Sequence, residues 1–80
     1  MTTNPIQLDK IPPKTKAKVQ KINGGYGLIQ KLQVMGIRTG QNITLSSKQP
    51  FRGPITIKIN DRELTLGRGM AKKILVEVIE

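Results

Sequence analysis

The sequence predicts a mainly β fold, a small and partly open barrel of about five antiparallel strands. One α-helix is expected after the first core strand, and a one-turn helix before the last strand. The prediction depends on short segments in which apolar and polar residues alternate, on the glycines and prolines that separate them, and on one segment with helical periodicity. Closing a short sheet hides its edges and builds one core from few residues, which suits a single domain over residues 1–80.

The first predicted core strand spans residues 16–22. Lys14, Lys16 and Lys18 occupy alternate positions, and Ala17 lies on the opposite face. A period of two is typical of a strand that is buried on one side only. We therefore expect the lysines to line a solvated face of the sheet.

The segment from Tyr26 to Met35 has the periodicity of an amphipathic helix. Leu28, Leu32 and Met35 stand at positions i, i+4 and i+7, so they share one face of about three helical turns. Gly36 is expected to end the helix because glycine enters the left-handed backbone region without a steric penalty. Gly40 is expected to form a tight turn before the next strand.

Alternation returns in the second half of the chain. A strand is predicted over residues 42–46, and a loop over residues 49–54, which contain two prolines and a glycine. A β-hairpin follows, with strands over residues 55–59 and 64–66 and a polar turn at residues 60–63.

The last elements are a single helical turn at residues 70–73 and a closing strand over residues 74–79. Gly67-Arg68-Gly69 before them is expected to form a bulge or a tight turn. The phases of the strands and the helix together predict the core. Its candidate members are Val19, Ile22, Leu28, Leu32, Ile37, Ile43, Leu45, Ile55, Ile57, Leu64, Leu66, Ile74 and Val76.

The composition excludes much chemistry. The chain contains no His and no Cys, so it offers no imidazole base, no thiolate nucleophile and no soft ligand for zinc, iron or copper. The carboxylates are scattered in sequence, which argues against a site for a hard cation. They are Asp9, Asp61, Glu63, Glu77 and Glu80. We therefore expect no enzymatic activity, no resident metal and no cofactor.

The N-terminal segment carries no sign of export. Residues 1–11 are polar and contain a proline, whereas a secretory signal needs an apolar run of about 7–15 residues. We therefore expect a protein that is kept in the cytoplasm.

Gly24-Gly25-Tyr26-Gly27 precedes the predicted helix, but it lacks the Lys-Ser/Thr ending of a phosphate-binding loop, so a chain reversal explains it better.

The net charge of +9, from 14 Lys and Arg against 5 Asp and Glu, indicates a negatively charged partner. Nucleic acid, anionic lipid and acidic protein all qualify, and solvated lysines also simply keep a small domain soluble. Tyr26 and Phe51 are the available stacking aromatics, and they lie in loop-like positions, neither of them alternating with basic neighbours on a predicted strand. Specific nucleic-acid recognition is therefore disfavoured, while contact with a nucleic-acid backbone stays an alternative.

Several short motifs, in their order along nearly the whole chain, resemble those of one protein family. They are Ile6-Gln7-Leu8-Asp9-Lys10-Ile11, Ala17-Lys18-Val19, Gln30-Lys31-Leu32-Gln33-Val34-Met35-Gly36-Ile37, Gly40 with Ile43, Gly53-Pro54-Ile55, and Leu66-Gly67-Arg68 with Ala71, Ile74 and Val76. The family is FeoA, small cytoplasmic accessory proteins of bacterial ferrous iron transport. Thr39 departs from the proline that the family often has before the turn glycine.

The resemblance implies an SH3-like barrel without enzymatic activity, related to the C-terminal barrel of iron- and manganese-dependent repressors. It also implies a partner, the FeoB membrane transporter, through its cytoplasmic GTP-binding domain. We expect the protein to bind that domain. Its basic surface would also attract it to the anionic surface of the inner membrane. A stand-alone relative of the repressor domain is the alternative. The expected contact residues are Lys31, Arg38, Arg52, Arg68, Lys72 and Lys73.

Overall fold

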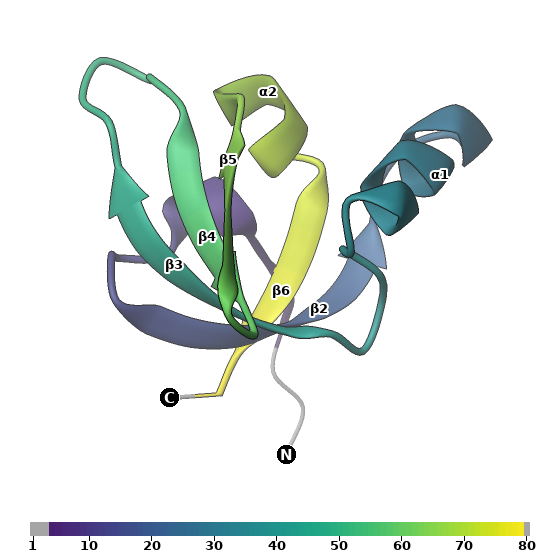
Figure 1. Cartoon of the computed structure of the whole chain (residues 1–80), viewed down its shortest axis with the longest axis horizontal. Coiled ribbons are helices and arrows are strands. Elements are labelled where there is room, and N and C mark those ends of the chain that lie inside the picture. The colour runs from purple at the N-terminus through teal and green to yellow at the C-terminus, as the bar shows by residue number, and fades with distance from the viewer. Residues whose placement is uncertain (1–3, 80) are drawn as a thin grey trace.

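The computed structural model describes residues 4–79 of the chain. Figure 1 shows a strongly curved sheet with a longer helix at its side and a one-turn helix above it. In chain order the elements are β1 (Ile6–Gln7), the 3₁₀ helix η1 (Leu8–Lys10), β2 (Thr15–Ile22), α1 (Tyr26–Val34), β3 (Asn42–Lys48), β4 (Ile55–Ile59), β5 (Arg62–Leu66), α2 (Arg68–Ala71) and β6 (Ile74–Val78).

The strands form one antiparallel sheet in the order β1-β6-β2-β3-β4-β5. β1 and β5 lie at its edges, so the barrel stays partly open, as the sequence predicts. The register shifts between Val19 and Lys21 in β2 and between Leu45 and Ser47 in β3. Such bulges bend and twist a strand, which lets a short sheet curve around its core.

The N-terminal segment forms a strand that its sequence pattern does not predict. β1 pairs with β6, with Ile6 opposite Val76, and adds a sixth strand to the predicted five. Leu8 in η1 and Ile11 after it are 0% and 1% exposed. This segment therefore closes one side of the core instead of leading into the domain as a polar tail.

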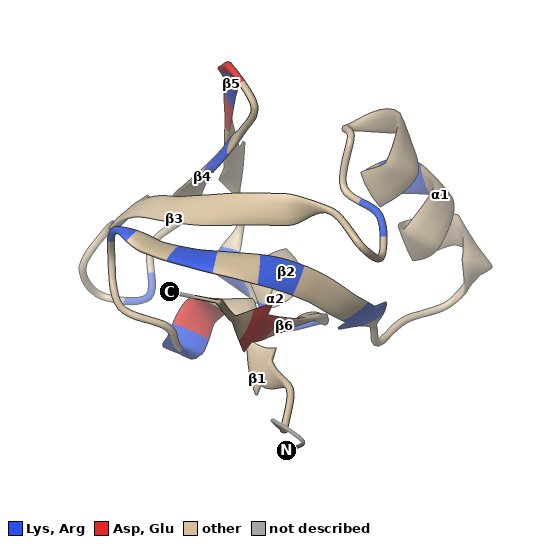
Figure 2. Ribbon diagram, turned by 90° about the horizontal axis from the view of Figure 1, so that it is seen from below, with Lys and Arg blue, Asp and Glu red and all other residues tan. Residues whose placement is uncertain are grey.

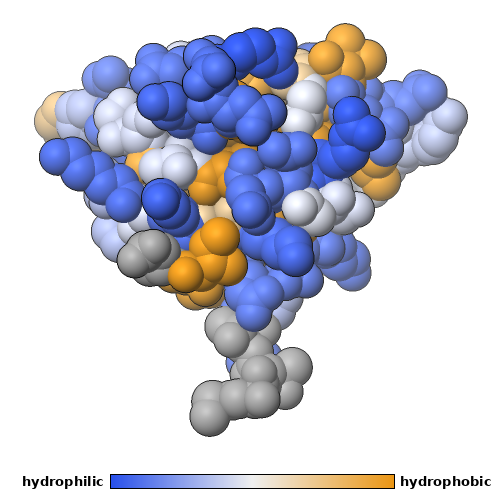
Figure 3. All heavy atoms as spheres, turned by 60° about the horizontal axis from the view of Figure 1, so that its bottom comes forward, coloured by the Kyte–Doolittle hydropathy of each residue, from blue (hydrophilic) through white to orange (hydrophobic). Residues whose placement is uncertain are grey.

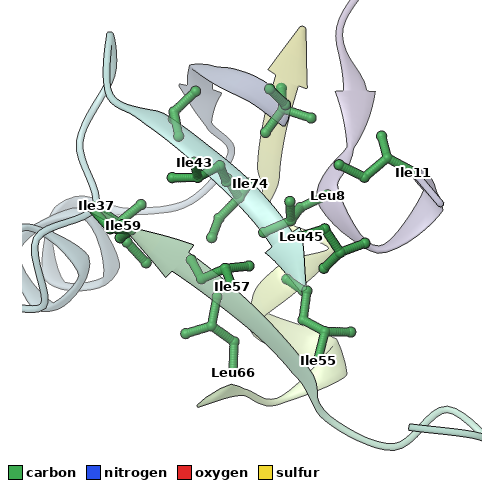
Figure 4. Close-up of a cluster of buried hydrophobic side chains, with 14 of the residues drawn as sticks. Leu8, Ile11, Ile37, Ile43, Leu45, Ile55, Ile57, Ile59, Leu66 and Ile74 are labelled. Carbon is green, nitrogen blue, oxygen red and sulfur yellow. The ribbon is translucent and has the colours of Figure 1, made fainter. Parts of the chain in front are cut away.

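The core is aliphatic and lies inside the curved sheet, where side chains of β3, β4, β6 and η1 meet (Figure 4). All the predicted core residues are buried except Leu28 and Leu64, which are partly buried. The prediction missed a further set of buried residues. They are Leu8, Ile11, Ala17, Ile59 and Ala71.

The end of α1 confirms the role predicted for Gly36. The helix ends at Val34 with Met35 as its C-cap, and Gly36 has a φ of +96°. The guanidinium Nη2 of Arg62 donates to the Met35 carbonyl at 2.9 Å, and a Cβ on Gly36 would lie 2.6 Å from that nitrogen. Glycine is thus required by the backbone angle, and its missing side chain leaves room for the Arg62 guanidinium at the end of the helix.

Two local predictions were wrong. Lys14 precedes β2 in a left-handed conformation, with a φ of 66°, so it does not continue the strand alternation. Gly67-Arg68-Gly69 forms no bulge: Gly67 is the N-cap of α2, and its carbonyl accepts a hydrogen bond from the Ala71 amide at 3.0 Å. The one-turn helix therefore begins at Arg68 instead of Met70.

The β4–β5 turn and the strand β3 also differ from the prediction in their bounds. β5 begins at Arg62, so the turn between β4 and β5 consists of Asn60 and Asp61. Asn60 takes a φ of 55° there, which asparagine tolerates better than most residues because its side chain can bond the local backbone. β3 extends to Lys48, beyond the predicted residue 46.

Candidate functional site

Part of the expected contact set lies at one end of the barrel. The loop of residues 49–54 between β3 and β4 and the helix α2 both lie at the top of Figure 1. The loop carries Arg52, α2 begins with Arg68, and Lys72 and Lys73 follow α2 directly. We name these four side chains the α2-end cluster. Its members are exposed except Arg68, which is half-buried.

Arg68 joins the two parts of the α2-end cluster. Its Nε donates to the Gly53 carbonyl at 2.9 Å, and its Nη2 donates to the Gln49 carbonyl at 3.0 Å. Each bond satisfies a loop carbonyl with a charged donor, which makes it stronger than a neutral hydrogen bond. Arg68 thus holds the β3–β4 loop against α2, a role that the sequence did not predict.

Lys31 and Arg38 lie apart from the α2-end cluster. Lys31 is on α1, Arg38 is in the segment between α1 and β3, and both are exposed. Figures 1 and 2 show this segment and the loop that carries Arg52 on opposite sides of the molecule. The convergence of Arg38 with Arg52, on which a single contact patch would depend, is therefore not found.

The tip of the β3–β4 loop presents the most exposed large apolar side chain among residues 4–79. Phe51 is 98% exposed. Phe51 and Arg52 have φ values of 59° and 60°, and the Gly53 amide donates to the Pro50 carbonyl at 3.1 Å. Two central residues with positive φ are the pattern of a type I′ turn, which prefers Asn-Gly. The sequence signal for it was weak because neither Phe nor Arg favours this turn.

A second basic surface lies on the outer face of the sheet. Lys16 of β2 and Lys58 of β4 both pair with Thr44 of β3, so the two lysines flank it across three strands. They line a shallow hollow of about 380 Å³, together with Ile79 and neighbouring residues. Figures 2 and 3 show this side as basic and mostly hydrophilic, with small apolar areas. With Lys14 outside the strand, the predicted lysine stripe on β2 is shorter than expected.

The outer face of α1 is only weakly apolar. Tyr26 is 75% exposed and its hydroxyl accepts a hydrogen bond from the Gln30 side chain at 3.0 Å, while Val34 is 87% exposed. Leu32 is the buried residue of the helix. Tyr26 and Phe51 belong to different elements, and neither lies on a strand beside basic residues, so they form no shared platform for stacked bases.

The carboxylates do not gather. Among residues 4–79, no group of three or more acidic side chains is placed to hold a metal ion. Asp9 is buried, and its Oδ1 has no hydrogen-bond partner. The Asp9 backbone carbonyl accepts a hydrogen bond from Lys48 Nζ at 2.8 Å, and Glu77 accepts one from the Gln20 amide. The Glu77 carboxylate therefore joins β6 to β2, whereas the hydrogen bond at Asp9 involves its backbone and not its carboxylate.

The glycine-rich segment before α1 has a packing explanation. Gly25 is the N-cap of α1 and provides no side-chain cap. A Cβ on Gly24 would lie 2.5 Å from Leu28 Cδ2, so a larger residue there would displace the Leu28 side chain in the first helical turn.

In the described part of the chain, no helix has the length and apolarity needed to cross a membrane.

Comparison with known proteins identifies relatives of the whole fold. The FeoA domain profile matches residues 6–78. A protein of Methanocaldococcus jannaschii named "Putative Fe(2+) transport protein A" is 39% identical over 62 residues, which are 78% of this chain and 73% of that protein.

Solved structures give the same result. The NMR structure of a FeoA-like protein from Clostridium acetobutylicum is 34% identical, with a TM-score of 0.87 over 99% of this chain and 92% of that one. A crystal structure described as the iron uptake regulatory protein FeoA is 28% identical, with a TM-score of 0.85 over 96% of this chain and all of that one.

The same barrel fold also occurs as one part of longer proteins. A manganese-dependent transcriptional repressor matches with a TM-score of 0.87 at 20% identity, over 98% of this chain but 38% of the repressor. At this identity the similarity shows the fold alone.

Proposed function

Because the chain belongs to the FeoA family, we propose that it is a non-enzymatic accessory protein of ferrous iron uptake that binds the cytoplasmic GTP-binding domain of a FeoB-type transporter. The observation that carries the proposal is the match of the FeoA domain over residues 6–78. Residues 1–80 act together as one domain in this proposal.

A protein contact, and not chemistry on iron, is the mode of action we propose. The chain has no His and no Cys, the residues that most often supply nitrogen and sulfur ligands to iron and other transition metals. A role in iron uptake without an iron site requires that the protein act on another component of the pathway. Binding to the transporter from the cytoplasm, at the inner membrane surface, fulfils that requirement.

Charge supports the contact. A net charge of +9 raises encounter rates with an acidic protein surface and with anionic lipid around it. The proposed contact residues keep the predicted set, now in two groups: the α2-end cluster, and Lys31 with Arg38 on the α1 side. We propose that the α2-end cluster makes the main contact because its basic side chains lie around one loop and one helix.

Charge reversal at the α2-end cluster tests this assignment. The variant Lys72→Glu with Lys73→Glu should bind the purified FeoB GTP-binding domain at least about tenfold more weakly than the wild type, because like charges across an interface repel. Binding should also depend less on salt. Isothermal titration of the full chain at low and at physiological salt measures both effects. Arg68 is left unchanged in this variant because it braces the β3–β4 loop.

The matched control is Lys16→Glu with Lys58→Glu, which changes the net charge equally on the outer face of the sheet. It should weaken binding far less. Equal losses in both variants would mean that only total charge matters. Unchanged affinity and unchanged salt dependence in Lys72→Glu with Lys73→Glu would contradict the α2-end cluster as the contact surface.

The alternative of nucleic-acid backbone binding rests on the exposed lysines alone, and that of a stand-alone relative of the repressor domain rests on the shared fold. A titration with mixed oligonucleotides at moderate salt separates it from the proposal. A contact made only by charge weakens steeply with salt and ignores sequence, so undetectable binding excludes both forms of the alternative, whereas sequence-independent binding that is lost with salt excludes only specific recognition.

A further inference from the structure

The tip of the β3–β4 loop has a left-handed backbone at two residues, Phe51 and Arg52, whose side chains disfavour that conformation. A left-handed backbone places Cβ close to the following carbonyl, so it is unfavourable for residues other than glycine, asparagine and aspartate. Phe51 and Arg52 both adopt it, in sequence, at φ values of 59° and 60°. An Asn-Gly pair would make the same turn with less strain. Strain retained at an exposed loop points to a function of the side chains that it displays.

The loop that displays Phe51 is held from several sides. The Gln49 amide donates to the Pro54 carbonyl at 3.0 Å, and the Gly53 amide donates to the Pro50 carbonyl at 3.1 Å. Arg68 donates to the carbonyls of Gly53 and Gln49. A Cβ on Gly53 would lie 2.7 Å from that of Gln49, so the loop backbone is closely packed. The turn is therefore fixed before any partner binds.

Within residues 4–79, no part of the chain buries Phe51. The ring is 98% exposed, whereas the other aromatic residue, Tyr26, has a hydrogen bond from its own helix. A phenylalanine buries a large apolar area when a partner covers it. A pre-formed loop also lowers the ordering entropy lost on binding. These properties are those of an interface anchor.

The fixed geometry favours a protein pocket over a lipid surface as the site that receives Phe51. A fluid bilayer interface accepts an aromatic ring from a flexible loop equally well, so it gives no reason for a strained and braced turn. A pocket in a folded protein requires one position and direction of the ring. Arg52, the next residue of the loop, and the lysines after α2 are exposed and basic, so they favour a pocket that acidic groups surround.

We propose that Phe51 is the anchor of this protein, inserting into an apolar pocket with an acidic rim on its protein partner, with Arg52 meeting that rim. Arg68 acts as a positioning residue, because it fixes the loop without needing to touch the partner. The inference rests on the proposed function in one respect: the partner is taken to be the cytoplasmic domain of the transporter.

The decisive variant is Phe51→Asn with Arg52→Gly, which removes the anchor and supplies the pair that the turn prefers. Its thermal stability should equal or exceed that of the wild type, because the backbone strain is relieved. Its affinity for the purified FeoB GTP-binding domain should fall by roughly 30-fold or more, the loss typical of a central apolar anchor. Isothermal titration and a thermal melt of the full chain measure the two quantities.

Single substitutions separate the ring from the turn. Phe51→Leu keeps an apolar anchor and should retain most of the affinity, whereas Phe51→Ser should lose it as the double variant does. Both leave Arg52 and the bracing bonds of Arg68 in place. If Leu and Ser at position 51 give equal affinity, the anchor role is wrong even if the double variant folds poorly.

The remaining outcomes distinguish this inference from the proposed function. Wild-type affinity in the double variant overturns the anchor and leaves the transporter contact intact. Failure of the wild type to bind the domain overturns both. Sedimentation with phosphatidylcholine vesicles, with and without phosphatidylglycerol, provides the lipid test: binding should not depend on Phe51. Vesicle binding that Phe51→Ser abolishes would replace the protein pocket by a lipid surface.

Discussion

Leu8→Ala is expected to lower the free energy of unfolding by about 2–5 kcal/mol, the range for truncating a fully buried leucine. Leu8 is 0% exposed in η1, whose neighbours are α2 and β6. A domain of this size has a total stability of about 4–12 kcal/mol. The Leu8 side chain therefore contributes a large share of the free energy of unfolding.

Chemical and thermal denaturation of Leu8→Ala measure this loss directly. The midpoint temperature should fall by roughly 10 °C or more, since about 1 kcal/mol shifts it by 4–8 °C in a domain of this length. Leu8→Met keeps the volume and should cost less than about 1.5 kcal/mol. Ile6→Ala changes an apolar residue of the same segment that is 38% exposed. A loss in Ile6→Ala equal to that in Leu8→Ala would contradict the specific role of Leu8.

Leu32→Ala is expected to release α1 from the barrel. Leu32 is the buried residue of that helix and is 0% exposed, while Leu28, Ile29 and Met35 are only partly buried against the core. Truncation of a buried leucine costs about 2–5 kcal/mol. A nine-residue helix without tertiary contacts is unstable in water, because isolated helices shorter than about 12–15 residues are marginal.

Amide hydrogen exchange tests this local release. In Leu32→Ala, the amides of α1 should lose protection while those of β3 and β4 keep most of theirs. Val34→Ala is the matched control in the same helix, because Val34 is 87% exposed and should be replaced with little effect. Equal loss of protection in α1 and in the sheet would show that the helix and the barrel unfold as one unit.

Alternation and helical periodicity made most of the fold predictable. Residues such as Ile43, Leu45 and Ile57 stand in strands whose period of two assigns them directly to the buried face. Leu8 and Ile11 escaped prediction because isolated apolar residues among polar ones carry no period. They become buried because β1 pairs with β6 and η1 packs against α2 and β6, which are contacts between distant parts of the chain.

The candidate site was less predictable than the fold, for a similar reason. Basic residues could be listed from the sequence, but their grouping depends on where loops lie. The hydrogen bonds of Arg68 to Gln49 and Gly53 bring α2 to the β3–β4 loop, whereas the segment between α1 and β3, which carries Arg38, lies on the other side of the barrel. The exposure of Phe51 depends on the left-handed turn, which its residue types do not favour.

Ferrous iron uptake by cells tests most directly whether this protein acts on the transporter. Three strains are compared, all without the chromosomal copy of this protein and with equal levels of the FeoB-type transporter. One carries an empty plasmid, one expresses the wild type, and one expresses Lys72→Glu with Lys73→Glu. We expect the empty strain and the charge-reversed variant to deviate from the wild type in the same direction. Equal uptake rates in all three strains would contradict the proposed accessory role.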